Sequence, residues 1–172
     1  MPLNREFDEF FMRMALREAQ RAAEDGEVPT GCVIVESPAS ADASPTEVRI
    51  LGRAHNQTEM LSDATAHAEM LALSQAFTAK GAWRLSGTRL YVTKEPCPMC
   101  AGAIVLARVD AVVWGLSDPK RGGMTEFGIF SHPGINHHPE VVSGVLEDDC
   151  RTVIQDFFRE RRRAARAPET GA

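Results

Sequence analysis

Residues 67–69 read His-Ala-Glu, and residues 95–100 read Glu-Pro-Cys-Pro-Met-Cys. Together the two stretches supply an imidazole, two thiols and a carboxylate. Two thiolates and an imidazole suit zinc, whereas a hard cation would need more oxygen ligands. A structural zinc site would be closed by a fourth Cys or His, and the sequence has none at suitable spacing near either stretch. The sequence therefore predicts a catalytic zinc site held by His67, Cys97 and Cys100, with the fourth position open to water.

The segments around the two motifs predict how the fold brings them together. A helix is expected at about 66–79, and a strand at 90–93 runs directly into the second motif, which opens another helix at about Pro98. Both motifs then lie at helix N-termini on one edge of a sheet, where the helix dipoles favour thiolate and hydroxide over their protonated forms. Glu69, two residues from His67, is left free to handle protons.

The rest of the chain predicts an α/β protein. Apolar spacing indicates an amphipathic helix at 6–24 and a last helix from Glu147, with further strands at 31–35, 48–52, 111–115 and 141–145 and a protruding loop at 37–46. The first two strands most simply pair antiparallel, whereas the long connection before the last strand permits a parallel crossover without proving one. We expect a three-layer α/β/α sandwich with a five-stranded mixed sheet, one domain over residues 1–167, and a disordered tail at 168–172.

Composition and cysteine usage exclude several classes of protein. No window of the 172 residues approaches the roughly 20 apolar residues of a membrane span, and the N-terminus lacks the apolar core of a signal peptide, so a cytoplasmic protein without a membrane partner is expected. Four cysteines are too few and too unevenly placed for a disulfide framework, and Cys32 and Cys150 are expected to be small buried hydrophobic residues. The net charge of −5 argues against indiscriminate coating of nucleic acid, but it says little about a local patch.

Each half of the motif also has a simpler interpretation. A lone His at a helix start is more often a cap or a core residue, and a lone Cys-x-x-Cys can be a thioredoxin-like redox pair. The three histidines His132, His137 and His138 suggest a second metal, but their setting among Pro, Gly and Asn favours a role in shaping a loop. Only the combination of the two halves favours zinc strongly.

Taken together, the two motifs resemble the zinc-dependent cytidine/deoxycytidylate deaminase superfamily. The resemblance implies one zinc ion per subunit, bound by His67, Cys97 and Cys100. It also implies that Glu69 takes a proton from the attacking water and delivers it to the ring nitrogen and the leaving amine, so that ammonia is released.

Further stretches resemble the tRNA-specific adenosine deaminase branch of that superfamily, and they are residues 63–66, 101–103, 118–120, 132–137 and 157–162. This resemblance covers residues 7 to 163 and implies a cytidine deaminase-like fold, a homodimer, and conversion of adenosine to inosine at the wobble position of a tRNA anticodon stem-loop. The resemblance implies substrate contacts at Asn56, Ala68, Asp118, Lys120, Phe158 and Arg159. Lys120 and Arg159 are favoured over the aromatic pair Phe157 and Phe158, which could equally be core anchors.

The C-terminal arginines fit a polyanionic partner, and they are Arg159, Arg161, Arg162, Arg163 and Arg166. Each phosphate that such a side chain neutralises adds salt-dependent affinity. Without the motifs, a run of this kind is more often a solvated helix face.

Three features depart from the family pattern: Lys94 stands where an apolar residue is usual, residues 124–127 replace a loop richer in Gly and Ser, and the 37–46 loop is long.

Two other functions stay open at this point. The same chemistry can act on a free nucleobase or nucleoside, such as guanine or cytosine, and such a substrate needs no extended basic surface. A non-catalytic, zinc-stabilised subunit that binds RNA or a protein partner is also possible, but it would not need the Glu69 carboxylate.

Overall fold

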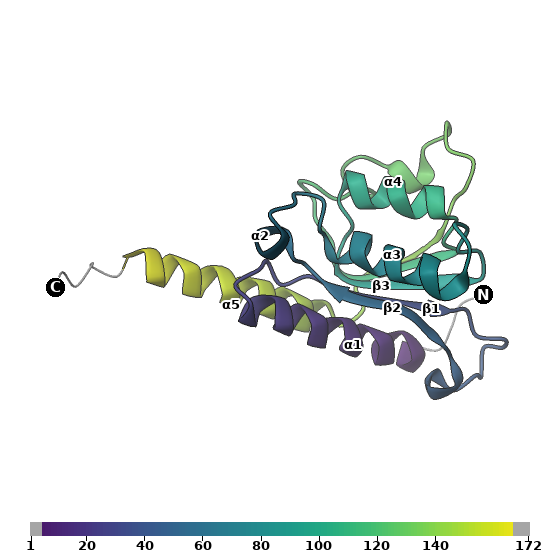
Figure 1. The fold of residues 1–172 in the computed structure, drawn as a ribbon, viewed down its shortest axis with the longest axis horizontal. Coiled ribbons are helices and arrows are strands. Elements are labelled where there is room, and N and C mark those ends of the chain that lie inside the picture. The colour runs from purple at the N-terminus through teal and green to yellow at the C-terminus, as the bar shows by residue number, and fades with distance from the viewer. Residues whose placement is uncertain (1–4, 167–172) are drawn as a thin grey trace.

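A five-stranded mixed sheet forms the middle layer of the computed structural model, which describes residues 5–166 (Figure 1). The strands are β1 (Gly31–Glu36), β2 (Ile50–His55), β3 (Thr88–Lys94), β4 (Ala111–Leu116) and β5 (Glu140–Val142), in the order β2-β1-β3-β4-β5. β1 pairs antiparallel with β2 and β3, whereas β3, β4 and β5 run parallel. The long connection before β5 is therefore a parallel crossover.

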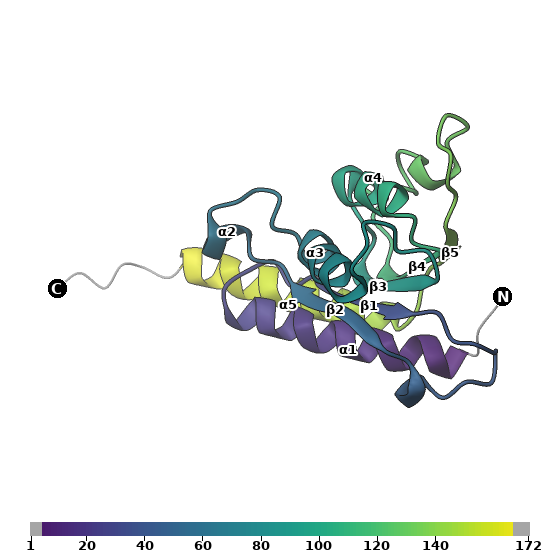
Figure 2. The ribbon, with the colours of Figure 1, turned by 45° about the vertical axis from the view of Figure 1, so that its right-hand side comes forward.

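Helices cover both faces of this sheet (Figure 2). On one face lie α1 (Arg5–Glu24) and α5 (Glu147–Arg166), and on the other lie α3 (Ala68–Lys80) and α4 (Pro98–Ala107). Short helical turns are α2 (Thr58–Leu61), η1 (Pro45–Glu47) and η2 (Ile129–Ser131). Along β1, Cys32 and Ile34 enter the core beneath α3, and Val33 and Val35 enter the core beneath α1. Burial on both faces explains the unbroken apolar run in the sequence and confirms the three-layer sandwich.

Several element boundaries differ from the sequence-based expectation. β2 occupies 50–55 rather than 48–52, because Arg53 and His55 belong to an exposed edge strand and reach Glu18 of α1, with Arg53 Nε 2.8 Å from its carboxylate. β5 ends at Val142 rather than at 145, because the chain turns at Gly144, whose φ is +77°. The segment 56–63, for which the sequence analysis predicted no helix or strand, contains α2.

The cysteines outside the motif behave as expected. Cys32 and Cys150 are fully buried, in the cores on opposite faces of the sheet, and all four cysteines are free thiols. Among the helices of residues 5–166, none is long and apolar enough to cross a membrane. The expected tail at 168–172 lies outside the described residues, and a single domain over 1–167 stays a prediction.

Two glycines let the helices approach the sheet closely. A Cβ atom at Gly31 would lie 1.9 Å from the carbonyl oxygen of Ala15 in α1, and one at Gly52 would lie 2.3 Å from the carbonyl oxygen of Ala72 in α3. Since backbone atoms cannot yield as a flexible side chain does, these positions set the distance between each helix and the sheet.

Replacing Gly52 with Ala should lower the free energy of unfolding by about 1–3 kcal/mol, because α3 must move away from β2. Gly102 in α4 is the matched control, since a Cβ atom there meets nothing within 4 Å. Gly102→Ala should be neutral or stabilise by up to about 1 kcal/mol. Urea-induced unfolding, followed by circular dichroism, measures both variants. Equal midpoints would show that the α3–β2 spacing is not a tight constraint.

Candidate active site

The two motifs meet where α3 and α4 begin. His67 is the residue that precedes α3, with an extended backbone (φ −73°, ψ 152°), so it lies just outside the helix rather than in its first turn. Cys97 holds the same position before α4, and Cys100 lies in the first turn of that helix. Pro98 occupies the first helical position, where its fixed φ and missing N–H are well tolerated. The predicted meeting of two helix N-termini is confirmed.

The three sequence-predicted ligands are brought together. His67 Nδ1 lies 3.6 Å from Cys97 Sγ and 3.5 Å from Cys100 Sγ. The ligand atoms of all three residues lie within 4.8 Å of one another. A tetrahedral zinc ion with Zn–N of about 2.0–2.1 Å and Zn–S of about 2.3 Å separates its nitrogen and sulfur ligands by about 3.6 Å. The donor atoms therefore fit zinc in both chemistry and spacing.

The interactions within the triad favour the thiolate form of one of its cysteines. The hydrogen bond with Cys100 is the main cause that lowers the pKa of Cys97 to about 4, so Cys97 is a thiolate at neutral pH. The same interaction and burial raise the pKa of Cys100, and the hydrogen bond with Cys97 raises the pKa of His67. A thiolate is the form of cysteine that binds a metal.

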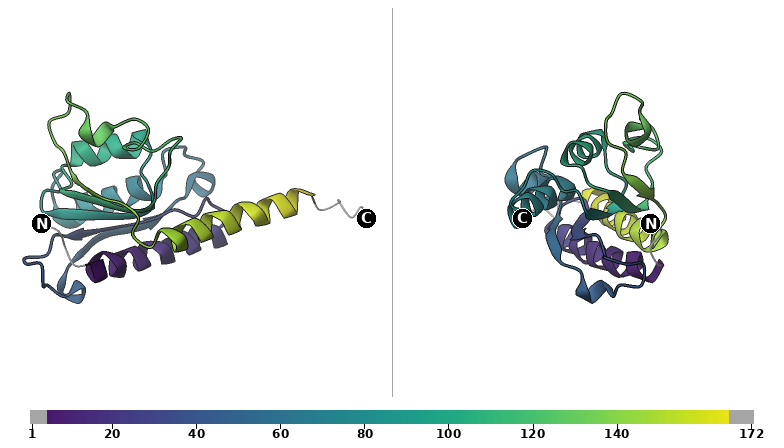
Figure 3. Two further views of the ribbon diagram at one scale, coloured as in Figure 1. Left: turned by 180° about the vertical axis from the view of Figure 1, so that it is seen from behind. Right: turned by 90° about the vertical axis from the view of Figure 1, so that its right-hand side faces the viewer.

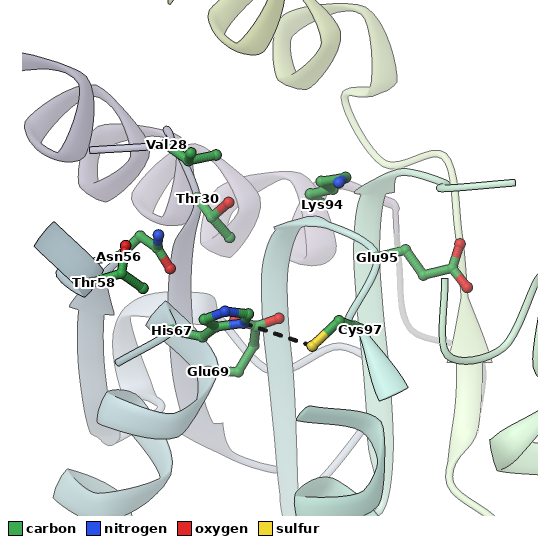
Figure 4. Close-up of a pocket in the computed structure, with 9 residues that line it drawn as sticks. All are labelled: Val28, Thr30, Asn56, Thr58, His67, Glu69, Lys94, Glu95 and Cys97. Atoms are coloured by element: carbon green, nitrogen blue, oxygen red, sulfur yellow. Dashed lines mark hydrogen bonds between the residues drawn. The ribbon is translucent and has the colours of Figure 1, made fainter. Parts of the chain in front are cut away.

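Glu69 lies in the first turn of α3 and is 3% exposed. Burial raises the pKa of Glu69 to about 7, although the charge of His67 opposes this shift. Figure 4 shows its carboxylate beside the His67 ring, on the Cys97 side. A carboxyl group with such a pKa can both accept and donate a proton near neutral pH.

A cavity of about 240 Å³ lies over the triad (Figure 4). It is lined by Val28, Thr30, Asn56, Thr58, His67, Glu69, Lys94, Glu95 and Cys97. Asn56, which the family resemblance implied as a base contact, follows the end of β2 and thus shares the cavity with Glu69. Of the residues that line the cavity in the described chain, Lys94 alone is a lysine or arginine.

Two buried carboxylates that the sequence analysis did not single out hold the walls of this cavity. Glu27 is 1% exposed and accepts hydrogen bonds from Thr58 Oγ1 at 3.1 Å and from the backbone N–H of Met60 at 2.8 Å. It thereby fixes α2 and the side of the cavity that Thr58 lines. Two residues on the polar surface segment 56–63 are thus tied to the core, and no spacing pattern in the sequence signals this.

Glu95 holds the opposite wall. Its side chain points away from the cavity in Figure 4 and accepts four hydrogen bonds. They come from the N–H groups of Asp118 (2.8 Å), Met124 (3.1 Å) and Thr125 (2.7 Å) and from Thr125 Oγ1 (2.7 Å). Gly122 completes the packing, since a Cβ atom there would lie 2.4 Å from Glu95 Cδ. The sequence motif contained Glu95, but its role in organising residues 118–125 depends on contacts distant in the chain.

Asp118 does not line the cavity but pairs with Lys94, which does. Its carboxylate is 2.7 Å from Lys94 Nζ and accepts the backbone N–H groups of Lys120 (3.0 Å) and Arg121 (3.1 Å). Burial alone would raise the pKa of Asp118, but the hydrogen bond from Lys94 reverses this and lowers it. The Asp118 carboxylate is therefore already bonded to Lys94 and to two backbone N–H groups of the protein. The predicted contacts of Asp118 and of the exposed Lys120 with substrate stay predictions.

The other predicted contact residues are not among those that line the cavity. Ala68 is fully buried in the core under α3, and Phe158 and Arg159 lie on α5. Phe157 is 7% exposed, whereas Phe158 is 39% exposed, so only the first of the pair is a core anchor. Arg159 pairs with Asp156 at 2.8 Å. Their contacts with substrate are not tested by the geometry and stay predictions.

The histidines of the 130s shape a loop, as expected. His132 Nδ1 accepts the N–H of Gly134 at 3.0 Å, and ring nitrogens of His137 and His138 bond the carbonyl oxygens of Val109 (2.7 Å) and Phe130 (2.9 Å). Within residues 5–166 these histidines form no group of potential metal ligands.

The fold and the triad together define a zinc-site protein built on a five-stranded α/β sandwich. Residues 5–116 match the family model of the cytidine and deoxycytidylate deaminase zinc-binding region. The chain belongs to this cytidine and deoxycytidylate deaminase family. The resemblance inferred from residues 67–69 and 95–100 is therefore confirmed, and with it the zinc-binding character of the site.

Similar proteins extend this result over nearly the whole chain. A tRNA-specific adenosine deaminase of Bacillus subtilis is 47% identical over 161 residues, which are 93% of this chain and 94% of the relative. A structure from a study of A-to-I editing by tRNA:A34 deaminases is 41% identical with a TM-score of 0.75, and the match covers 84% of this chain and 98% of that one. A guanine deaminase structure from Bacillus subtilis is 33% identical with a TM-score of 0.55, over 70% and 69% of the two chains.

The zinc assignment predicts about one zinc ion per chain in the purified protein, measured by plasma mass spectrometry. Cys100→Ala should lose most of this zinc, because a ligand is removed from a site with only three. Cys150→Ala is the matched control, since it removes an equally buried thiol from the core on the other face of the sheet. Full zinc content in Cys100→Ala would contradict the assignment of the ligands.

Proposed function

We propose that this protein is a zinc-dependent hydrolytic deaminase that converts adenosine to inosine at the wobble position of a tRNA anticodon. The observation that carries the proposal is the His67-Cys97-Cys100 triad with the Glu69 carboxyl group beside it in one cavity. Its support from the comparisons is the 47% identity, over 93% of the chain, to a tRNA-specific adenosine deaminase.

The residues of the site divide the chemistry between them. His67, Cys97 and Cys100 would hold zinc, which would supply a Lewis acid and a nucleophilic water at neutral pH. Glu69 takes a proton from the attacking water and passes it to N1 of the purine. It then transfers the proton of the new C6 hydroxyl group to the amine, so that the C6–N bond breaks, ammonia leaves and the C6 carbonyl of inosine forms. The burial that raises the pKa of Glu69 to about 7 suits this exchange of protons in both directions.

The size of the cavity supports a single base as its occupant. At about 240 Å³ it is smaller than pockets of roughly 300–1,000 Å³ that enclose a whole drug-sized ligand. A nucleotide turned out of an RNA loop would place its base in the cavity and leave its sugar and phosphates outside. The amide of Asn56 offers both a donor and an acceptor for the edge of an adenine.

The position of α5 supports RNA as the substrate. Beyond Phe157 every described residue of α5 is exposed, and the segment 159–166 holds five arginines against one glutamate. Figures 1 and 3 show this part of α5 extending past the sheet on the side of α2, which is the end of the sheet where the cavity lies. Phosphates near a base in the cavity can therefore meet a basic helix.

A deaminase of a free base is the second candidate, and the 33% identity to a guanine deaminase structure favours it. Such an enzyme would share the triad, but its substrate carries no phosphate for a projecting, arginine-rich helix to bind. A purely zinc-stabilised binding subunit would leave the buried Glu69 without a role.

The homodimer and the cytoplasmic location belong to the same proposal. Apolar side chains that are exposed on α4 and on the segment between β4 and η2 support the homodimer, namely Leu106 at 74% and Phe127 at 55%. Light scattering of the purified protein would give twice the monomer mass if this surface is an interface between two copies.

Glu69→Ala should keep its zinc and its fold but reduce inosine formation by a factor of about 100 to 10,000, because proton transfer is lost. Inosine is read as guanosine when product tRNA is reverse-transcribed and sequenced. Glu59→Ala, on exposed α2, is the matched control and should retain its turnover. Undiminished turnover of the Glu69 variant would remove it from the mechanism, and an unchanged adenosine in every tRNA treated with the wild type would count against the proposed function.

Joint replacement of Arg159, Arg161 and Arg162 by Ala should weaken tRNA binding and make the logarithm of the affinity less dependent on the logarithm of salt concentration. The slope should fall by up to about 0.9 for each phosphate that the protein no longer neutralises. Filter binding at several salt concentrations provides the measurement. Joint replacement of Arg5, Arg13 and Arg17 by Ala removes the same net charge from exposed positions on α1 and is the matched control. A salt slope equal to that of the wild type would make α5 an ordinary solvated helix.

A further inference from the structure

Lys94 is a charged residue that lines the cavity, at a position where an apolar residue is usual in the family. It is the last residue of β3, and it is the one lysine or arginine among the described residues that line the cavity. Its side chain is 35% exposed and its ammonium group pairs with Asp118, so this group stays accessible to solvent beside the cavity. An apolar residue could pack against a base equally well, and the charge therefore calls for its own explanation.

The position of the Lys94 ammonium group is set by Asp118. Nζ lies 2.7 Å from one carboxylate oxygen of Asp118, while the other oxygen accepts the N–H groups of Lys120 and Arg121. Asp118 is in turn fixed through its own N–H, which donates to the buried Glu95. The ammonium group is thus held at one point on the rim by a chain of contacts that ends in the core.

Pairing with Asp118 leaves most of the N–H donors of the Lys94 ammonium group unused. Among the described residues Lys94 forms one salt bridge, and Asp118 accepts the backbone N–H groups of the exposed residues Lys120 and Arg121. An ammonium group has three N–H donors, and Asp118 uses one of them. Such a group can accept an anion without giving up its ion pair.

The substrate places its own anionic groups at this rim. If a base occupies the cavity over His67 and Glu69, the ribose and the flanking phosphates must lie at the mouth, because the cavity is only about 240 Å³. The deeper polar groups of the cavity are neutral or acidic, among them Thr30, Asn56 and Glu69, so Lys94 is the group there with charge complementary to a phosphate.

We propose that Lys94, oriented by Asp118, binds a phosphate adjacent to the flipped adenosine. It is then a substrate-binding residue of the mouth, separate from the arginines of α5. This inference rests on the proposed function, since it requires a nucleotide chain whose base enters the cavity.

Binding can be measured without turnover by using the Glu69→Ala background and a fluorescently labelled anticodon stem-loop RNA. Adding Lys94→Leu should weaken binding by about five- to tenfold at about 50 mM salt and flatten the salt slope by about 0.7, the value for one contact to single-stranded RNA. Lys94→Arg should retain most of the affinity, because it keeps the charge. Lys80→Leu is the matched control, since Lys80 ends α3, about 18 Å along the helix axis from the site.

Steady-state kinetics of variants with Glu69 intact provide the second measurement. Lys94→Leu should raise KM, with kcat changed much less, because the phosphate contact acts in binding. If Lys94→Leu and Lys80→Leu give equal affinities and salt slopes, the proposal is wrong. A loss of kcat with unchanged affinity and slope would also overturn it, since Lys94 would then serve only to position Asp118. Failure of the wild type to form inosine in the same assay counts separately against the proposed function.

Discussion

The structure depends on the meeting of two helix N-termini at one edge of the sheet. His67 and Cys97 each lie immediately before a helix, 30 residues apart in the chain, yet their side chains are 3.6 Å apart. This separation is what a tetrahedral zinc ion requires of a nitrogen and a sulfur ligand, about 3.6 Å. The sheet achieves it because β3 leads directly into the second motif while α3 packs closely on β2 through Gly52. A zinc ion would in turn join directly two segments that packing and the contacts of His67 with the two cysteines already bring together.

Three buried carboxyl groups near the triad have different roles. Glu69 is buried without a salt-bridge partner among the described residues, and the resulting rise of its pKa suits proton transfer. Glu27 and Glu95 are equally buried, but each accepts hydrogen bonds that fix one wall of the cavity. The difference lies in their surroundings, since a carboxylate saturated with N–H and O–H donors is a structural acceptor and one facing an open cavity is available for chemistry.

The sequence predicted the parts of the site that follow from local pattern. The ligands, the order of the elements and the two helix starts could be read from motif spacing and apolar periodicity, and both sheet faces from the apolar run at 31–35. The predicted bounds of β2 were wrong because an edge strand tolerates polar residues. The predicted end of β5 was wrong because the chain turns earlier, at Gly144. The tasks of Glu27 and Glu95 and the pairing of Lys94 with Asp118 could not be predicted, because each depends on partners 23 to 33 residues away that only the folded chain brings near.

The chemistry and the choice of substrate are located in different parts of the molecule. The triad and Glu69 define the reaction on a base, whereas the residues around Asp118 and the projecting part of α5 bear on which molecule presents that base.

The central claim, an open zinc site made by three protein ligands, is tested most directly by X-ray absorption at the zinc edge. It predicts two sulfur neighbours at about 2.3 Å and two lighter neighbours at about 2.0–2.1 Å, one of them from His67 and one exchangeable. A shell of three or four sulfur atoms, or one closed by a fourth protein ligand, would contradict it.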